Sequence, residues 1–111
     1  MVLIMKKFIV LLPLFALLTA FQQGTKPPEI PAEVQGLLQK HGCVACHYMT
    51  LKVVGPSWLD IAAKKYTAKR ISALIKTPEP GNWPGFVPML AQANIPKTEL
   101  ATISKWLANL K

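Results

Sequence analysis

The segment from Thr77 to Pro96, TPEPGNWPGFVPMLAQANIP, limits most strongly what this chain can fold into. It contains five prolines and two glycines. Proline has no backbone N–H and its ring clashes with the preceding helical turn, so neither a long helix nor a central strand can form there. The segment is therefore predicted to be a long loop. Such a loop is unusual in a chain of 111 residues unless it serves a function.

Short helices are predicted on both sides of this loop. Apolar side chains recur at helical spacing in residues 32–41, 58–65, 68–76 and from about Pro96 to Leu110, and Ser57 and Thr67 are suitable N-caps. No stretch alternates like a strand, so residues 32–111 are predicted to form an all-α domain. Helices this short make a thin core, and domains of this size often need a disulfide, metal or cofactor.

Residues 1–20 have the pattern of a secretory signal peptide. Two lysines precede the apolar run 8–18, which is shorter than the roughly 20 residues needed to cross a bilayer and ends near the small residue Ala20. We expect export, with residues 21–31 as a proline-containing tether. An uncleaved membrane anchor stays open, because Leu18 lies where a small residue is preferred before a cut after Ala20. If the segment is cleaved, no stable membrane insertion is expected.

The net charge of the chain indicates which classes of partner it can bind. The formal net charge is +8 for the whole chain, and +6 once the predicted signal segment with Lys6 and Lys7 is removed. A charge of this size favours solubility and can steer docking onto an acidic protein surface. Nucleic-acid binding would require basic residues interleaved with exposed aromatic residues, or a known module, and the sequence contains neither. No nucleic-acid partner is predicted.

The only two cysteines, Cys43 and Cys46, are followed directly by His47 in the stretch GCVACH. The pattern C-x-x-C-H is the attachment signature of c-type haem. Its two thiols add to the two vinyl groups of the haem, and the histidine that follows becomes an axial ligand of the iron. We therefore expect one covalently attached haem c per chain, a large apolar group that the long loop could cover.

Other uses of the motif fit less well. A C-x-x-C oxidoreductase requires a βαβ context that the sequence lacks. A zinc site that recruits His41 would draw four ligands from seven consecutive residues, which is poor tetrahedral geometry. A structural disulfide between Cys43 and Cys46 would close a very small loop and so gain little.

The second axial ligand is predicted by elimination among four methionines. Met1 and Met5 lie in the signal segment, and Met49 is too close to His47 in sequence to reach the opposite face of a haem. Met89, on the long loop, is left. Its alternative role is to fill the core, as methionines often do. Iron ligated by His and Met suits electron transfer, whereas an open position would suit gas or peroxide chemistry.

With these features the chain resembles the small bacterial monohaem class I cytochromes c. The resemblance covers about residues 32–111 and includes GCVACH, the VGP at 54–56, the VPM at 87–89 and the KWL at 105–107. It implies a class I cytochrome c fold, with about four to five short helices packed around one haem. It also implies that helix 32–41 crosses the C-terminal helix, where Gly36 could permit close approach to Trp106.

The resemblance further assigns two residues around the haem. It implies that the carbonyl of Pro56 accepts a hydrogen bond from Nδ1 of His47, and that Trp83 donates to a haem propionate. Trp83 could instead pack on the haem edge. The sequence departs from the family at Thr77–Asn82, where a glycine-rich segment is common, and at Pro84. These changes leave the propionate contacts open.

The implied function is a periplasmic one-electron carrier and not an enzyme. Its redox partners would dock weakly through acidic surfaces, with Lys40, Lys52, Lys64 and Lys97 as candidate contacts. Two alternatives stay open. The chain could be the electron-transfer subunit of a multisubunit oxidoreductase, or a five-coordinate haem sensor or peroxidase-like protein if Met89 does not bind iron. It would be membrane-anchored if its N-terminal segment were retained.

Overall fold

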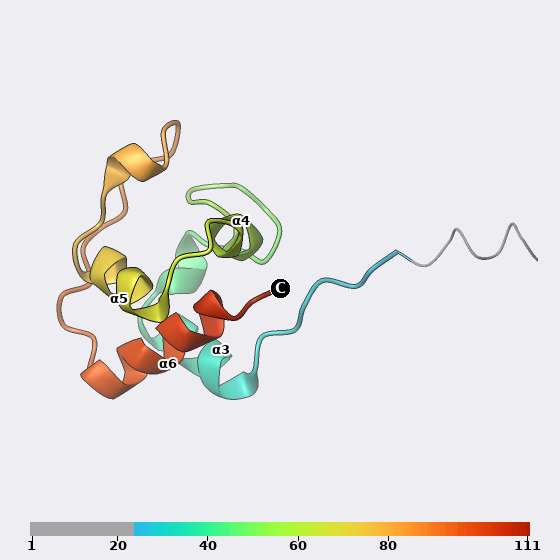
Figure 1. Ribbon diagram of the computed structural model, residues 1–111, viewed down its shortest axis with the longest axis horizontal. Coiled ribbons are helices and arrows are strands. Elements are labelled where there is room, and N and C mark those ends of the chain that lie inside the picture. Colours follow the sequence, from blue (N-terminus) through green and yellow to red (C-terminus); the bar gives the residue numbers. More distant parts are fainter. Residues whose placement is uncertain (1–23) are drawn as a thin grey trace, which may run out of the picture.

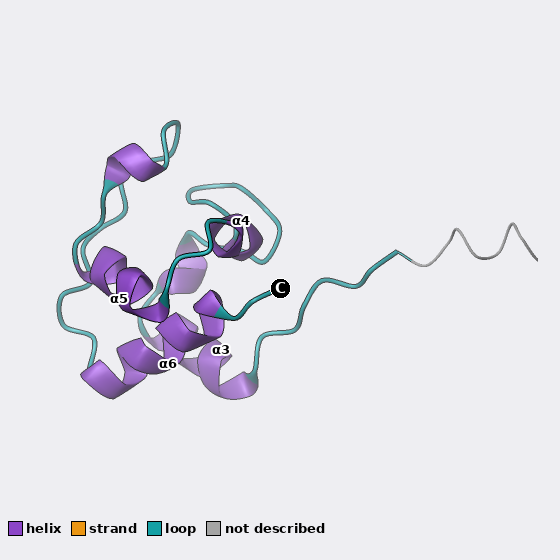
Figure 2. Cartoon of the chain, in the orientation of Figure 1, coloured by secondary structure: helices purple, strands orange, loops and turns teal. Residues whose placement is uncertain are grey.

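The computed structural model describes residues 24–111, and its regular structure is helical throughout that range (Figures 1 and 2). The elements are α3 (Ala32–Lys40), η2 (Cys43–Ala45), α4 (Trp58–Ala63), α5 (Ala68–Lys76), η3 (Pro80–Asn82) and α6 (Lys97–Ala108), where η denotes a 3₁₀ turn. The predicted all-α class is confirmed.

The predicted signal segment, residues 1–20, lies outside the described residues. Residues 24–31 contain no helix, and none of the described helices is long and apolar enough to cross a membrane.

The starts of the helices follow the capping residues predicted from the sequence. The Ser57 hydroxyl accepts from the Asp60 amide, and the Thr67 hydroxyl accepts from the Arg70 amide, each at 3.1 Å. One predicted end is wrong. The helix expected to run to Lys65 stops at Ala63, because Lys65 has a φ of 56°, which is left-handed and cannot continue the helix.

The core lies where α3, α4 and α5 pack against α6 (Figure 1). Trp58 is buried in this core, and Trp106 packs edge-on against it, with ring centroids 5.4 Å apart. The crossing of α3 and α6 is confirmed. The role expected of Gly36 is wrong, because a Cβ added there would meet no atom within 4 Å. The buried residues of the core are Val34, Leu38, Trp58, Ile71, Ile103, Leu107 and Leu110.

A polar cluster also joins α3 to α6. Glu99 of α6 accepts from Lys40 at 2.6 Å and pairs with Nε2 of His41 at 2.7 Å. Lys40, and then His41, hold the pKa of Glu99 below its ordinary value. His41 is the C-cap of α3, so its side chain lies at the helix end, as the sequence predicts.

The proline-rich segment is a long excursion between α5 and α6, broken only by η3 (Figure 1). The part of the segment that leads back toward α6 is joined to α5 by a hydrogen bond from the amide of Gln92 to the carbonyl of Ile75, at 3.0 Å. The excursion closes one side of the space above α5 and α6, and in this way it helps to form the cavity described next.

Candidate cofactor site

A large apolar cavity of about 570 Å³ lies between the motif segment, α5, α6 and the long loop. This volume is in the range of roughly 300–1,000 Å³ that is usual for small-molecule and cofactor sites. All six residues singled out from the sequence line it, namely Cys43, Cys46, His47, Pro56, Trp83 and Met89. The fold thus brings together residues that are up to 46 positions apart in sequence.

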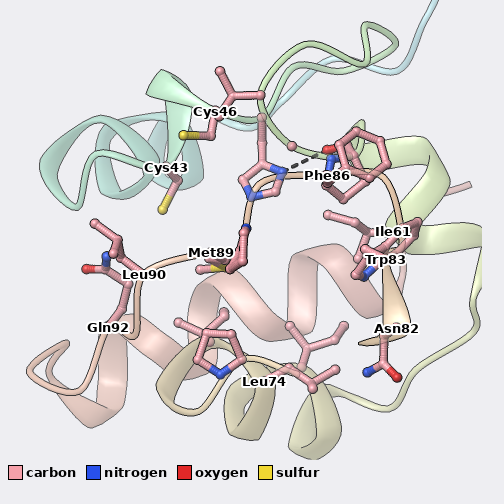
Figure 3. Close-up of a pocket in the computed structure, with 18 of the residues that line it drawn as sticks. Cys43, Cys46, Ile61, Leu74, Asn82, Trp83, Phe86, Met89, Leu90 and Gln92 are labelled. Atoms are coloured by element: carbon pink, nitrogen blue, oxygen red, sulfur yellow. Dashed lines mark hydrogen bonds between the residues drawn. The ribbon is translucent and has the colours of Figure 1, made fainter. Parts of the chain in front are cut away.

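The two cysteines are presented by a tight turn after α3. Gly42 has a φ of 73°, which reverses the chain, and the 3₁₀ turn η2 begins at Cys43. The amides of Cys46 and His47 both donate to the carbonyl of Cys43, at 3.3 and 3.1 Å. Figure 3 shows Cys43 and Cys46 on one side of the cavity and Trp83 and Asn82 on the other, with Met89 between them in this view.

The two thiols are not joined in a disulfide. Burial raises the pKa of the Cys43 thiol, and the neighbouring Cys46 adds to this effect. A disulfide oxidoreductase needs a thiol whose pKa is lowered, and the pKa of Cys43 is shifted in the opposite direction.

The imidazole of His47 is fixed in orientation and tautomer. Its Nδ1 lies 2.7 Å from the carbonyl oxygen of Pro56. Because a carbonyl can only accept, Nδ1 must carry the proton and Nε2 keeps its lone pair. Burial lowers the pKa of His47, although the Pro56 carbonyl opposes this, and the neutral form that can bind a metal is favoured.

Two neighbours restrict the ring of His47 further. A Cβ added to Gly55 would lie 2.8 Å from Cε1 of His47 and 3.0 Å from its Nδ1, so only glycine allows this approach. On another side, the ring of Trp58 packs against the imidazole, with centroids 4.7 Å apart. His47 is therefore held by a hydrogen bond, a close backbone contact and an aromatic contact.

Met89 is the methionine that lines the cavity, and its side chain is 40% exposed. Met49 instead packs against the core. The arrangement agrees with the elimination that singled out Met89 from the sequence. Figure 3 shows Met89 in the middle of the cavity lining, beside Leu90 and Gln92 of the same loop segment.

Trp83 lines the same cavity from the long loop. Its ring lies edge-on to Phe86, with centroids 6.3 Å apart, and the ammonium of Lys64 lies 4.8 Å from the centre of its ring. Within residues 24–111 the indole N–H of Trp83 donates to no protein group, so this donor is available to a bound molecule.

The donor set fits a covalently held haem and does not fit a bare metal ion. Two thiols and a neutral imidazole come from five consecutive residues, and a thioether faces the same apolar cavity from a distant loop. Within residues 24–111, no group of three or more His, Cys, Asp or Glu side chains is arranged to hold a metal ion.

Some residues around the cavity were not expected from the sequence. His41, assigned there only to a helix end, also borders the cavity, and so do Tyr66 and Gln92. Arg70 of α5 pairs with Glu79 of the loop. No sequence signal marks this last pair, because the two residues are nine positions apart and belong to different elements.

Comparison with known proteins gives consistent results. No protein-family model matches the chain. The chain is 34% identical to cytochrome c-551 of Allochromatium vinosum, with 82% of this chain and 99% of that protein covered. It is 41% identical to cytochrome c-551 of Pseudomonas denitrificans, with 68% and 94% covered. The crystal structure of wild-type Nitrosomonas europaea cytochrome c552 matches with a TM-score of 0.62 and 35% identity, over 69% of this chain and 99% of that chain.

Gly55→Ala should disturb the site through His47. The added Cβ would fall 2.8 Å from the imidazole, so the ring or the Gly55 backbone must shift, and we expect a loss of about 1–3 kcal/mol in the free energy of unfolding. Guanidinium unfolding of the purified protein measures it. Gly81→Ala is the matched control, because a Cβ there meets nothing within 4 Å. Equal stabilities of the two variants would contradict the close contact at Gly55.

Proposed function

Because the chain belongs to the small monohaem class I cytochromes c, which are electron carriers with one covalently attached haem c, we propose that it carries single electrons through a haem iron ligated by His47 and Met89. One observation carries the proposal: the motif His47 and the loop Met89 line the same apolar cavity from distant parts of the chain. When bound, the haem supplies an iron that alternates between the ferric and ferrous states.

The surrounding residues have distinct roles in this proposal. Cys43 and Cys46 hold the haem covalently, which fixes its position relative to His47. Pro56 fixes the tautomer of His47, so that Nε2 is the ligating atom without any rearrangement. Trp83 offers its unpaired indole N–H to a haem propionate.

Met89 and the apolar lining would set the reduction potential. A thioether ligand favours the ferrous state relative to a nitrogen or oxygen ligand. A low-polarity cavity disfavours the additional positive charge of the ferric state, which acts in the same direction. Both effects point to an electron carrier that is easily reduced, with no substrate chemistry of its own.

Two other functions differ from this one in a measurable way. As an electron-transfer subunit, the protein would keep the same haem ligation but form a stable complex with another protein. As a sensor or peroxidase-like protein, it would leave the iron open and bind carbon monoxide without displacing Met89. The position of Met89 in the cavity favours the six-coordinate carrier.

We place the carrier in the periplasm, because the signal-like segment 1–20 and the haem attachment motif require the same export route. Residues 21–31 would then be a tether in front of the domain 32–111. Redox partners would dock weakly near the cavity mouth, where Val87 and Leu90 are exposed. Without the predicted signal segment, which holds Lys6 and Lys7 and no acidic residue, the formal net charge falls from +8 to +6, and this positive charge favours partners with acidic docking surfaces.

Met89→Ala should retain the covalent haem, since Cys43 and Cys46 are unchanged, but lose the weak methionine-to-iron absorption band of the oxidised protein. The reduction potential should fall and carbon monoxide should bind readily to the reduced protein. Absorption spectra and a redox titration measure these effects. Met49→Leu is the control and should change none of them. A native spectrum in Met89→Ala, or ready carbon monoxide binding by the wild type, would contradict the ligand assignment.

The exported protein should begin near residue 21 and carry one haem. Intact mass under denaturing conditions measures both properties, because a thioether-linked haem stays on the polypeptide. A full-length mass with haem would instead indicate a retained N-terminal anchor. A mass without haem would contradict the proposed function itself.

The rate of electron transfer to an acidic redox protein should fall as salt is added, because salt screens the long-range attraction, with a Debye length of about 10 Å at 0.1 M. Stopped-flow measurements between low and high ionic strength test this. A rate that does not depend on salt would indicate that docking relies on the apolar residues at the cavity mouth.

A further inference from the structure

The part of the loop that carries Met89 has few attachments of its own. Within the described chain, residues 87–91 make no hydrogen bond, and Phe86 bonds only to Trp83 of the same loop. The position of Met89 therefore depends on how the loop is held before and after this span. After it, the amide of Gln92 donates to Ile75 of α5 at 3.0 Å.

Before residues 87–91, the loop is attached to the rest of the protein mainly through Glu79. One of its carboxylate oxygens, Oε2, pairs with the guanidinium of Arg70 on α5. The same oxygen accepts from the side chain of Asn82 at 3.0 Å, and the Glu79 carbonyl accepts from the Asn82 amide at 3.0 Å. One side chain thus links α5 to the turn η3, which leads directly to Trp83.

No other residue of the loop can replace this link. Glu79 is the only acidic residue between Asp60 and Glu99 in the sequence. Arg70, and then Asn82, hold the pKa of Glu79 below its ordinary value, so the carboxylate is charged at neutral pH. The same part of the loop is also held by Lys64, which lies over the ring of Trp83.

We propose that Glu79 is a positioning residue that, through Arg70 and Asn82, holds the loop against α5 so that Met89 stays over the cavity. The proposal rests on the ligation of iron by Met89. Glu79 and Asn82 also border the cavity, but within residues 24–111 no hydrogen bond joins Glu79 to the cofactor motif or to Met89. Glu79 acts on Met89 by disfavouring conformations in which the loop moves away.

The expected size of the experimental effect depends on the strength of the Arg70–Glu79 ion pair. The side chains of Arg70 and Glu79 are 43% and 48% exposed, so water competes for them and salt screens them. Exposed ion pairs contribute little to global stability. A weak link can nevertheless change how often the loop opens, because that local equilibrium involves few other contacts.

Free imidazole is a suitable probe, because it competes with Met89 for the iron of the haem-containing protein. Glu79→Gln removes the charge and should increase both the apparent affinity for imidazole and its limiting binding rate by about two- to fivefold. The midpoint temperature for loss of the methionine-to-iron band should fall, while guanidinium unfolding changes little. In 1 M sodium chloride, the wild type should approach the variant.

Glu33→Gln is the matched control. It removes the same charge from an exposed site on α3, where Glu33 makes no ion pair or hydrogen bond within residues 24–111, and it should behave as the wild type does. Exchanging the charges in Glu79→Arg with Arg70→Glu should restore part of the wild-type behaviour. Equal imidazole binding by Glu79→Gln and Glu33→Gln, or a difference that persists in 1 M salt, would overturn the proposal.

The two proposals fail in different ways. If the wild type lacks the methionine-to-iron band, ligation by Met89 is wrong, and the positioning role of Glu79 is wrong with it. If the wild type has the band and Glu79→Gln leaves imidazole binding unchanged, only the positioning role is wrong.

Discussion

The core and the cofactor cavity of this protein share the same side chains. Ile71, Ile103 and Leu107 are almost completely buried in the core, and each also lines the cavity. Helices of six to twelve residues cannot enclose a large apolar volume by themselves. The haem is therefore expected to complete the core as well as to carry the electron, so that the packing of α5 on α6 and the position of the loop both depend on what fills the cavity.

Much of the fold was predictable because its determinants are local. Ser57 and Thr67 each cap a helix through a residue three positions away, and Gly42 turns the chain at the haem motif, all within a few residues. The motif specifies its own chemistry, and elimination among the methionines predicted Met89 as the second ligand. Contacts between distant segments were less predictable. Gly36 was assigned a contact that it does not make, and the Arg70–Glu79 pair was not anticipated. Such contacts depend on how the loop folds back, which hydrophobic periodicity does not encode.

The proline-rich loop shows how a segment without regular structure can still have a defined position. Each proline fixes its own φ and restricts the residue before it, so the loop has fewer conformations to lose on folding than a glycine-rich one. Glycine remains where it is needed, since Gly85 has a φ of 91°. Within residues 24–111, the backbone between Trp83 and Gln92 has no hydrogen-bond partner in another element, so restricted dihedral angles replace hydrogen bonds in limiting where Met89 can lie.

Three of the lysines predicted to contact a partner differ in how much of their charge is available to it. Lys40 is paired with Glu99, and Lys52 lies 3.6 Å from the carboxylate of Asp60. In each pair the opposite charge is close, so the field at a distance is that of a dipole and decays quickly. Lys64 lies over the uncharged ring of Trp83, at the edge of the cavity, and keeps its full charge there. If a partner has an acidic surface, as proposed above, it would be attracted more strongly to Lys64 beside Trp83 than to the paired Lys40, and this asymmetry would orient the partner before contact.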